Sequence, residues 1–447
     1  MKPDRLFKWL IVLSAFLWLS PTACAPVPAT EPPVLSATAN TVPPTAAPTP
    51  SSEPSPQPTA APASSTVADT LIVAFVENGE LKLWHEATNQ TETIFDDGGV
   101  NTVTVSDDGQ IIAFTRHWLD FDQCEQTALW AVDRDGTNAR EIVTSAELRA
   151  TLADTDCGYP NVVFAQIEWL PRTHRLVYSV IWDGPHAPPQ GIHLADADVP
   201  SITQLIPPDY NLRFVVSPDG SQIALLSTSG LSFLNADGWR QDIVTYPKTG
   251  IPIPGFATGI WTLDSRAFIL VAPGQSWVDI LRVPVDGSAA QQLATLTDSH
   301  VDSVTLSPDG LHAAFTQPSA WFITPLAAEV GPLAIPKRII LDSPANLHWS
   351  PAGAAFAFPD KSNGFLFQLC PDATQSSQVC GGPLTLDNSY VDVILWIDGD
   401  QFLFLTREPR RLFLGRLDHT TVPIVTWPLE EWVIPESFSA VSLAPHK

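Results

Sequence analysis

The amino-acid sequence predicts an all-β fold, a closed ring of four-stranded antiparallel blades, and three observations lead to it. A hairpin pattern, two apolar strands around a turn with Asp and Gly, recurs along the chain, as in VTVSDDGQIIAFT at 103–115 and FVVSPDGSQIALLS at 214–227. Successive copies lie 43 to 47 residues apart, with one interval of 64, and such a period is typical of propeller blades. The last copy is only half a hairpin. Together these observations predict a β-propeller, most simply of eight blades, with seven as the alternative.

The first 24 residues are typical of a bacterial secretory signal. The basic start MKPDRLFK precedes twelve apolar-rich residues, WLIVLSAFLWLS, and small residues come just before Cys24. PTAC at 21–24 resembles the lipobox of bacterial lipoproteins, which implies removal of residues 1–23 as a signal peptide and lipidation of Cys24; Pro21 stands where that family prefers an aliphatic residue. An uncleaved anchor is the alternative. Either way, we expect a protein bound to the bacterial cell membrane on its extracytoplasmic face.

Residues 24–69 are expected to form a disordered stalk. Residues 25–69 hold 12 of the 43 prolines, among Ala, Thr and Ser, and contain no aromatic residue. This composition buries too little apolar surface to offset the chain entropy lost on folding. The stalk would hold the folded part away from the membrane.

Residues 70–447 are expected to form a single propeller domain. The position before each turn holds Val105, Trp169, Val216, Trp261, Leu306, Trp349, Trp396 and Leu443. Two further strands follow each hairpin, for example TALWAVDRDG and REIVT, and complete a blade of four. The first unit, TLIVAFVE, ELKLWHEA and TETIF, lacks an inner strand, whereas SFSAVSLAP at 437–445 is an inner strand without a following turn. We therefore predict that the C-terminal strand closes the first blade and removes an exposed sheet edge.

The SPDG turn, together with LWAVDRDG at 129–136, resembles the periplasmic TolB-like propellers and their WD-repeat relatives over essentially residues 70–447. The Trp-Asp pair that names the WD repeat is absent from the third strand ends. The resemblance implies the propeller fold and suggests an interaction protein of the envelope. It specifies no activity, because the same turn serves many unrelated functions.

Charge and motifs exclude several classes of function. Residues 70–447 carry 20 Lys and Arg against 44 Asp and Glu, a formal charge of −24, which argues against binding to nucleic acid because counterion release needs clustered cations. The sequence contains no nucleophile, metalloprotease, phosphate-loop or cofactor motif. We expect no cofactor and no metal.

Four cysteines besides Cys24 allow three pairings. Propeller connectivity places the loops of Cys124 and Cys157 on one face, and the hairpin flanked by Cys370 and Cys380 on the other. We predict the disulfides Cys124–Cys157 and Cys370–Cys380, in keeping with an oxidising compartment. Four reduced, buried thiols are the alternative.

The face that carries the loops between second and third strands and the connections between blades is the candidate binding surface. The insertions behind the 64-residue interval lie there. Aromatic residues suited to stacking, histidines and carboxylates fall in its loops. Loop capping and packing between blades are the alternative roles. The candidate ligand-binding residues are Arg116, His117, Trp118, Asp120, Asp122, Trp182, Asp183, His186, His300, Asp302, Tyr390 and Asp392.

These observations favour an envelope-tethered scaffold for protein interaction or ligand recognition, without catalytic activity of its own. Its partner would be an envelope protein or a cell-wall polysaccharide. The alternative is an extracytoplasmic carbohydrate-active hydrolase or lyase in which carboxylates such as Asp120, Asp302 and Asp392 act as acid and base.

Overall fold

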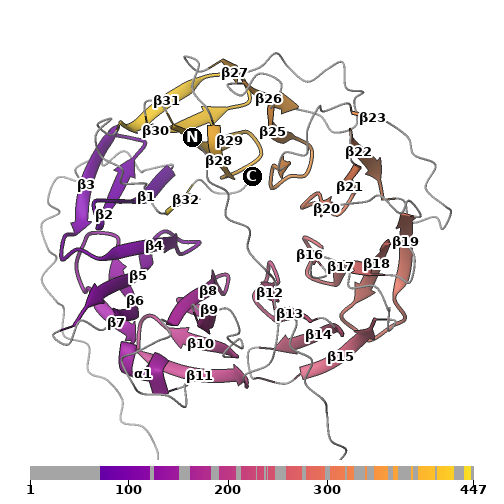
Figure 1. Cartoon of the computed structure of the whole chain (residues 1–447), viewed down its shortest axis with the longest axis horizontal. Helices are drawn as coiled ribbons and strands as arrows, with labels where there is room; N and C mark the ends of the chain where they lie inside the picture. The colour runs from indigo at the N-terminus through magenta and orange to yellow at the C-terminus, as the bar shows by residue number, and fades with distance from the viewer. Residues whose placement is uncertain are drawn as a thin grey trace, which may run out of the picture. The chain divides into compact units, whose positions relative to one another are not determined.

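The repeated hairpins become the inner halves of eight blades in the computed structural model, arranged in a ring (Figure 1). The eight-bladed prediction is confirmed, and the seven-bladed alternative is wrong. The described residues lie in a compact unit spanning 65–447. They are 71–120, 125–150, 162–182, 191–207, 213–227, 229–235, 238, 240–246, 258–273, 278–296, 303–317, 320–326, 338–339, 347–360, 366–370, 384–385, 391–407, 410–426 and 437–443.

We number the blades 1 to 8 along the chain, and each is one sheet in which neighbouring strands are antiparallel. Blade 1 contains β1 (Leu71–Glu77), β2 (Glu80–His85), β3 (Gln90–Phe95) and β32 (Phe438–Ser442). Blade 2 contains β4 (Val100–Val105), β5 (Ile111–Leu119), β6 (Glu125–Asp133) and β7 (Arg140–Val143), followed by helix α1 (Ser145–Ala150). Blade 3 contains β8 (Val162–Trp169), β9 (Arg175–Trp182), β10 (Ile192–Asp196) and β11 (Ser201–Ile206). Blade 4 contains β12 (Arg213–Val216), β13 (Gln222–Leu226), β14 (Gly230–Asn235) and β15 (Arg240–Thr245).

The second half of the ring repeats this plan. Blade 5 contains β16 (Thr258–Trp261), β17 (Ala267–Pro273), β18 (Val278–Pro284) and β19 (Gln291–Leu296). Blade 6 contains β20 (Ser303–Leu306), β21 (His312–Gln317), β22 (Ala320–Pro325) and β23 (Arg338–Ile339). Blade 7 contains β24 (His348–Trp349), β25 (Phe356–Asp360), β26 (Leu366–Cys370) and β27 (Leu384–Thr385). Blade 8 contains β28 (Val391–Trp396), β29 (Gln401–Arg407), β30 (Arg410–Arg416) and β31 (Thr421–Thr426).

The hydrophobic core lies between blades, because both faces of each sheet pack against a neighbour. Among the described residues, eight clusters of buried side chains occur, each shared by two adjacent blades. This explains why a second strand such as β1 has six consecutive buried residues, Leu71 to Val76, where a sheet with one wet face would alternate. Burial between blades also accounts for Trp261 and Trp349, which are 4% and 8% exposed.

Side chains of the inner strands also bind the backbone of the neighbouring blade. The indole Nε1 of Trp261 donates to the carbonyl of Val215 at 2.8 Å. Glu168, on β8, accepts from the amide of Val216 at 3.2 Å. Burial raises the pKa of the Glu168 carboxyl, although hydrogen bonds from Gln166 and Val216 oppose this change. Inner strands converge on the axis without pairing with one another, so these bonds replace ladder bonds between blades.

The C-terminal strand closes the ring, as predicted from SFSAVSLAP. β32 pairs with β1 in antiparallel register, with Leu71 opposite Ser442 and Phe75 opposite Phe438. It also contacts blade 2, because the hydroxyl of Ser439 accepts from the amide of Val105 at 3.2 Å. Blade 1 is therefore built from the two ends of the described segment.

Candidate functional site

The predicted binding face carries the end of β5, and four of the candidate residues lie there: Arg116, His117, Trp118 and Asp120. Asp122, Asp183, His186, His300, Asp302 and Tyr390 lie outside the described residues. Trp182 and Asp392 are placed only by their backbone, at the end of β9 and near the start of β28. Their grouping with the β5 residues stays a prediction.

Arg116 holds the connection between blades 1 and 2. Its Nε donates to the carbonyl of Gly98 at 3.1 Å, and its Nη2 donates to the carbonyl of Asp97 at 3.0 Å. The guanidinium carbon lies 4.9 Å from the ring centre of Phe95 and 5.0 Å from that of Trp130. These cation–π contacts and bonds fix the strand end on which Trp118 sits. The guanidinium acts as a positioning group here.

The connection fits closely against the same strand end. Gly99 has a φ of +76°, and a Cβ at this position would lie 2.5 Å from the carbonyl oxygen of His117. The carbonyl of Gly99 accepts from the amide of His117 at 2.8 Å. Only glycine satisfies both the left-handed backbone and the close approach. The backbone of the connection between blades 1 and 2 thus also holds the end of β5 in place.

Polar side chains beside this strand end are linked to one another. His117 Nδ1 lies 3.1 Å from the hydroxyl of Thr127. The Gln126 side-chain amide donates to a carboxylate oxygen of Asp120 at 2.5 Å, and its carbonyl accepts from the hydroxyl of Ser145 at the start of α1. Asp120, just after the end of β5, is therefore bonded to the facing strand β6 of its own blade.

Apolar side chains reach solvent at this strand end. Trp118 is 37% exposed and Leu119 is 56% exposed, although both belong to a strand whose preceding residues are buried. Ile181, 37% exposed, lies at the corresponding end of β9 in blade 3. Exposed apolar residues on a rigid edge are the type of surface that contacts a partner.

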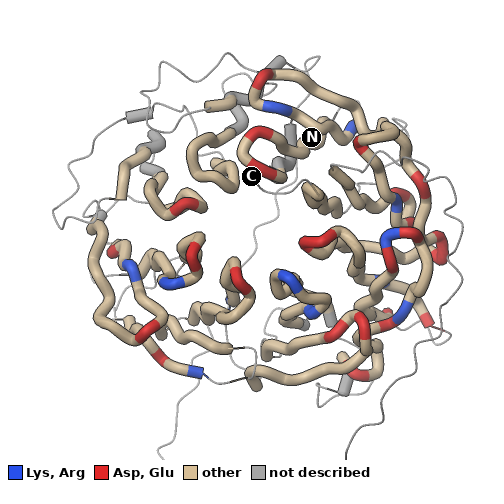
Figure 2. Tube along the Cα trace, turned by 180° about the vertical axis from the view of Figure 1, so that it is seen from behind, with Lys and Arg blue, Asp and Glu red and all other residues tan. Residues whose placement is uncertain are grey.

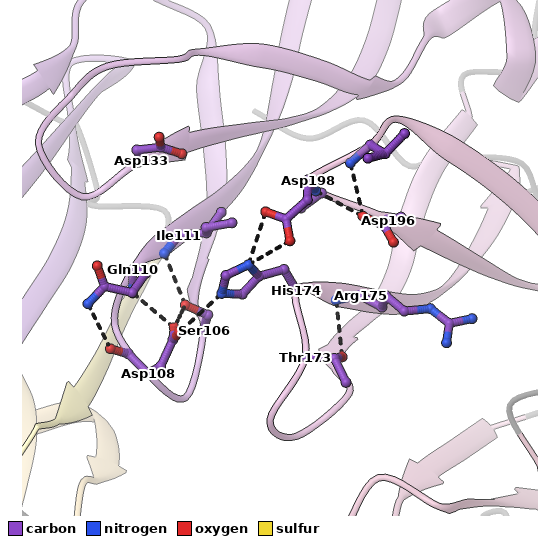
Figure 3. A network of polar contacts seen from close by, with 12 residues as sticks. Ser106, Asp108, Gln110, Ile111, Asp133, Thr173, His174, Arg175, Asp196 and Asp198 are labelled. Atoms are coloured by element: carbon purple, nitrogen blue, oxygen red, sulfur yellow. Dashed lines mark hydrogen bonds and ion pairs between the residues drawn. The ribbon is translucent and has the colours of Figure 1, made fainter. Parts of the chain in front are cut away.

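The opposite face holds a second feature, a cavity of about 700 Å³ at the turns of blades 1, 2 and 3. Apart from Ile111 its lining residues are polar or charged: His85, Glu92, Gln110, Asp133, Arg134, Asp135, His174 and Asp198. His174 lies between two carboxylates at one wall (Figure 3). Sequence reasoning missed His174. The available signals were LPRTH at 170–174, which departs from the SPDG turn, and the extra Asp107 in the turn before it.

Charge at His174 is set by its two neighbours. Partial burial alone would lower the pKa of the imidazole, but hydrogen bonds and charges of Asp108 and Asp198 outweigh it, and the pKa is raised above its ordinary value. Burial would raise the pKa of Asp108, but hydrogen bonds from the Gln110 amide, Ser106 and His174 lower it. The favoured state is therefore an imidazolium between carboxylates.

Within the described ranges, no group of three or more His, Cys, Asp and Glu side chains is arranged to hold a metal ion. No helix in those ranges is both long and apolar enough to cross a membrane. Cys370 is 2% exposed on β26, whereas Cys24, Cys124, Cys157 and Cys380 lie outside the described residues, so lipidation and both disulfides stay predictions.

Fold and site together define a β-propeller, and comparison with solved structures agrees. The chain is similar to dipeptidyl peptidase 4 of Porphyromonas gingivalis, with a TM-score of 0.50 and 10% identity over 79% of this chain and 57% of that one. It is similar to oligopeptidase B of Leishmania major, with a TM-score of 0.51 and 9% identity over 74% and 49%. TolB of Acinetobacter baumannii also matches, at a TM-score of 0.33 and 14% identity over 79% and 80%.

These likenesses show the fold alone. The chain spans 57% and 49% of the lengths of the two peptidases. No protein-family model matches the sequence, and no curated protein matches it.

Proposed function

We propose that the chain is a lipid-anchored, extracytoplasmic β-propeller of the bacterial envelope that acts as a protein-interaction or ligand-recognition scaffold, without catalytic activity of its own. The signal-like start, Cys24 and the proline-rich stalk support the location. The ring supports the scaffold role because its closure gives rigid strand ends on which exposed residues can be presented.

One observation carries the choice of surface. Trp118 and Leu119 are exposed on a strand end that Arg116 and Gly99 hold in place. A large aromatic ring that is already ordered loses little entropy on binding, which favours it as a contact residue. We therefore assign the partner to the face at the C-terminal end of β5.

Crosslinking and pull-down from intact envelopes, with the full chain as bait, tests this assignment. The double variant Trp118→Ser/Leu119→Ser should lose most of the captured protein partner. The matched control is Leu263→Ser/Leu311→Ser, because these two leucines are 65% and 57% exposed on turns of the opposite face; it should capture as much as the unaltered protein. Recovery of lipid but no protein would overturn the scaffold proposal, and equal loss in both variants would overturn the choice of face.

Location is tested separately, at Cys24. Cys24→Ala should abolish labelling by a clickable palmitate and release the protein from the membrane fraction. Unchanged labelling would show that another residue carries the lipid. Membrane retention without labelling would support the uncleaved anchor.

A further inference from the structure

Blades 2 and 3 meet at a charged contact on the cavity face. His174 Nε2 lies 3.0 Å from a carboxylate oxygen of Asp108, in the β4–β5 turn. Its Nδ1 lies 2.9 Å from a carboxylate oxygen of Asp198, in the β10–β11 turn. The imidazole therefore joins blade 3, its own blade, to blade 2 (Figure 3).

Hydrogen-bond chemistry fixes the charge that this geometry requires. A carboxylate can only accept, so both ring nitrogens must donate, and only the imidazolium has two N–H groups. A neutral imidazole keeps one of the bonds and turns a lone pair toward the other carboxylate. Asp108 and Asp198 would then face each other across a ring that no longer offsets their repulsion.

The turn of blade 3 lacks the residue pair that holds four of the other turns. The turns of blades 2, 4, 5 and 6 each hold a serine or threonine bonded to an aspartate two residues on, as Ser106 is to Asp108 at 2.7 Å. Blade 3 has Leu170 and Arg172 at these positions. The Thr173 hydroxyl holds this turn from within, because it donates to the carbonyl of Leu170 at 2.7 Å and accepts from the amide of Arg175 at 3.2 Å. The amide of Arg172 donates to Asp107 of blade 2 at 2.6 Å, so blade 2 adds a bond to the turn from outside.

Other charged and titratable groups lie on the elements packed around His174. They are Asp107 on the β4–β5 turn, Asp196 on β10, Asp133, Arg134, Asp135 and Arg140 around the β6–β7 turn, His85 and Glu92 in blade 1, and Arg172 and Arg175 beside His174 itself. Arg140 donates to the carbonyl of Ala197 and pairs with Asp133 at 2.9 Å. Asp196 accepts from the amides of Asp198 and Val199. These contacts leave Asp108 and Asp198 as the groups bonded to the imidazole.

We propose that Asp108, His174 and Asp198 form a clasp between blades 2 and 3 that closes when His174 is protonated. Loss of the proton from His174 lets the β4–β5 turn and the β8–β9 turn separate at this wall of the cavity. His174 and Asp198 line the cavity, so separation of the two turns widens it. The clasp is a conformational device that acts on the face opposite the proposed partner surface.

The direction of the pH dependence follows from the two groups. His174 has a raised pKa in the folded protein. Its contribution to the stability of the clasp is therefore complete below the ordinary imidazole range, about pH 6.5, and is lost as pH rises through the folded pKa. Asp108 has a lowered pKa, so its contribution is present above about pH 4 and is lost as pH falls through the folded pKa. The clasp is closed between these limits and opens toward alkaline pH.

Titration of the full chain with ¹³C-labelled histidine measures proton binding directly, with the His174 signal assigned from His174→Gln. We expect His174 to titrate above the ordinary imidazole range. Asp198→Asn should move its midpoint to lower pH and leave the His85 signal in place, because His85 pairs within blade 1 with Glu92. A His174 midpoint in or below the ordinary range, or one insensitive to Asp198→Asn, would overturn the proposal.

Hydrogen exchange tests the opening itself. At about pH 6, the amides of residues 106–111 and 170–175 should exchange at least about threefold faster in His174→Gln than in the unaltered chain, and the difference should shrink as pH rises through the His174 midpoint measured by the titration. His85→Gln is the matched control and should leave both segments unchanged. If His174→Gln does not fold, Asp198→Asn serves in its place. Exchange that is equal in variant and unaltered chain at the lower pH would contradict the clasp.

Discussion

The serine of the SPDG turn is a buried structural residue. Ser106, Ser217, Ser307 and Ser350 are each 0% exposed. In blade 4 the Ser217 hydroxyl donates to Asp219 at 2.7 Å and accepts from the amide of Gln222 at 3.0 Å. One hydroxyl thereby satisfies the carboxylate of the turn and an amide of the next strand, which explains the repetition of this residue without any catalytic role.

Removal of this hydroxyl should destabilise the ring measurably. Ser217→Ala removes the acceptor of the partly buried Gln222 amide and one of the bonds to Asp219, and we expect a cost of about 1–3 kcal/mol. Ser221→Ala is the control, because the Ser221 hydroxyl bonds the same Asp219 at 2.8 Å from an exposed position. Thermal unfolding should show a clear loss for the first variant and little for the second. Equal melting temperatures for the two variants would contradict a structural role of the Ser217 hydroxyl.

Individual residues also show where sequence reasoning stopped. Sequence position predicts Arg116 as a ligand-binding residue but does not predict the contacts of its guanidinium, which lies near the ring of Phe95 and donates to carbonyls 18 and 19 residues before it. His174 lies 66 residues from Asp108 in sequence. Which turns meet across a blade junction depends on the tilt and packing of whole sheets, and one sequence does not encode that in any local pattern.

At the scale of elements, β32 matters more than its five residues suggest. Val441 and Leu443 pack on the core between blades 1 and 2, and Phe438 and Ala440 pack on the core between blades 8 and 1. Ser437 adds a bond of 3.0 Å from the amide of Val103 to its hydroxyl. The strand therefore joins three blades.

Deletion of residues 437–447 should thus cost much more than deletion of an ordinary tail. Loss of the apolar contacts alone is worth roughly 5 kcal/mol or more, and β1 would become an exposed sheet edge prone to association. The control deletes only residues 444–447. A melting temperature that stays the same after the larger deletion would reject closure by β32.

For the whole molecule, the excess of acidic residues has two opposing effects on stability. Acidic positions recur on turns around the centre of the ring and on its rim (Figure 2). The formal charge of −24 for residues 70–447 opposes compaction at neutral pH. Several aspartates are nevertheless stabilised as carboxylates, because hydroxyls of Thr137, Ser288 and Thr420 lower the pKa of Asp135, Asp286 and Asp418.

These effects predict a stability maximum at mildly acidic pH. As pH falls from 7, protonation of ordinary carboxylates relieves repulsion and the melting temperature should rise. Aspartates with lowered pKa contribute stability above about pH 4 and lose it as pH falls further through their folded pKa. We expect the maximum at about pH 4.5 to 6. A melting temperature that increases steadily from this range to pH 8 would contradict the prediction, and added salt should flatten the neutral side.

The fold was predictable because a propeller repeats its information. Seven copies of one hairpin and a half-copy at 437–445 together fix the blade number, and the half-copy also fixes the closure. The candidate surface was predictable in part, since strand order alone places the end of β5 on one face. The cavity on the other face was not, because its lining comes from turns of three blades that meet only in the folded ring.

Closure by β32 also makes the choice of the first blade arbitrary, although the cyclic order of the blades is fixed. Leu71 and Ser442 are direct partners across two antiparallel strands, so a turn of the SPDG type could join them as it joins the two inner strands of other blades. The chain could then be opened at a different blade connection without loss of a strand pair. The chain ends can therefore be placed at another connection between blades. A circularly permuted chain should reach the same fold from a different starting blade.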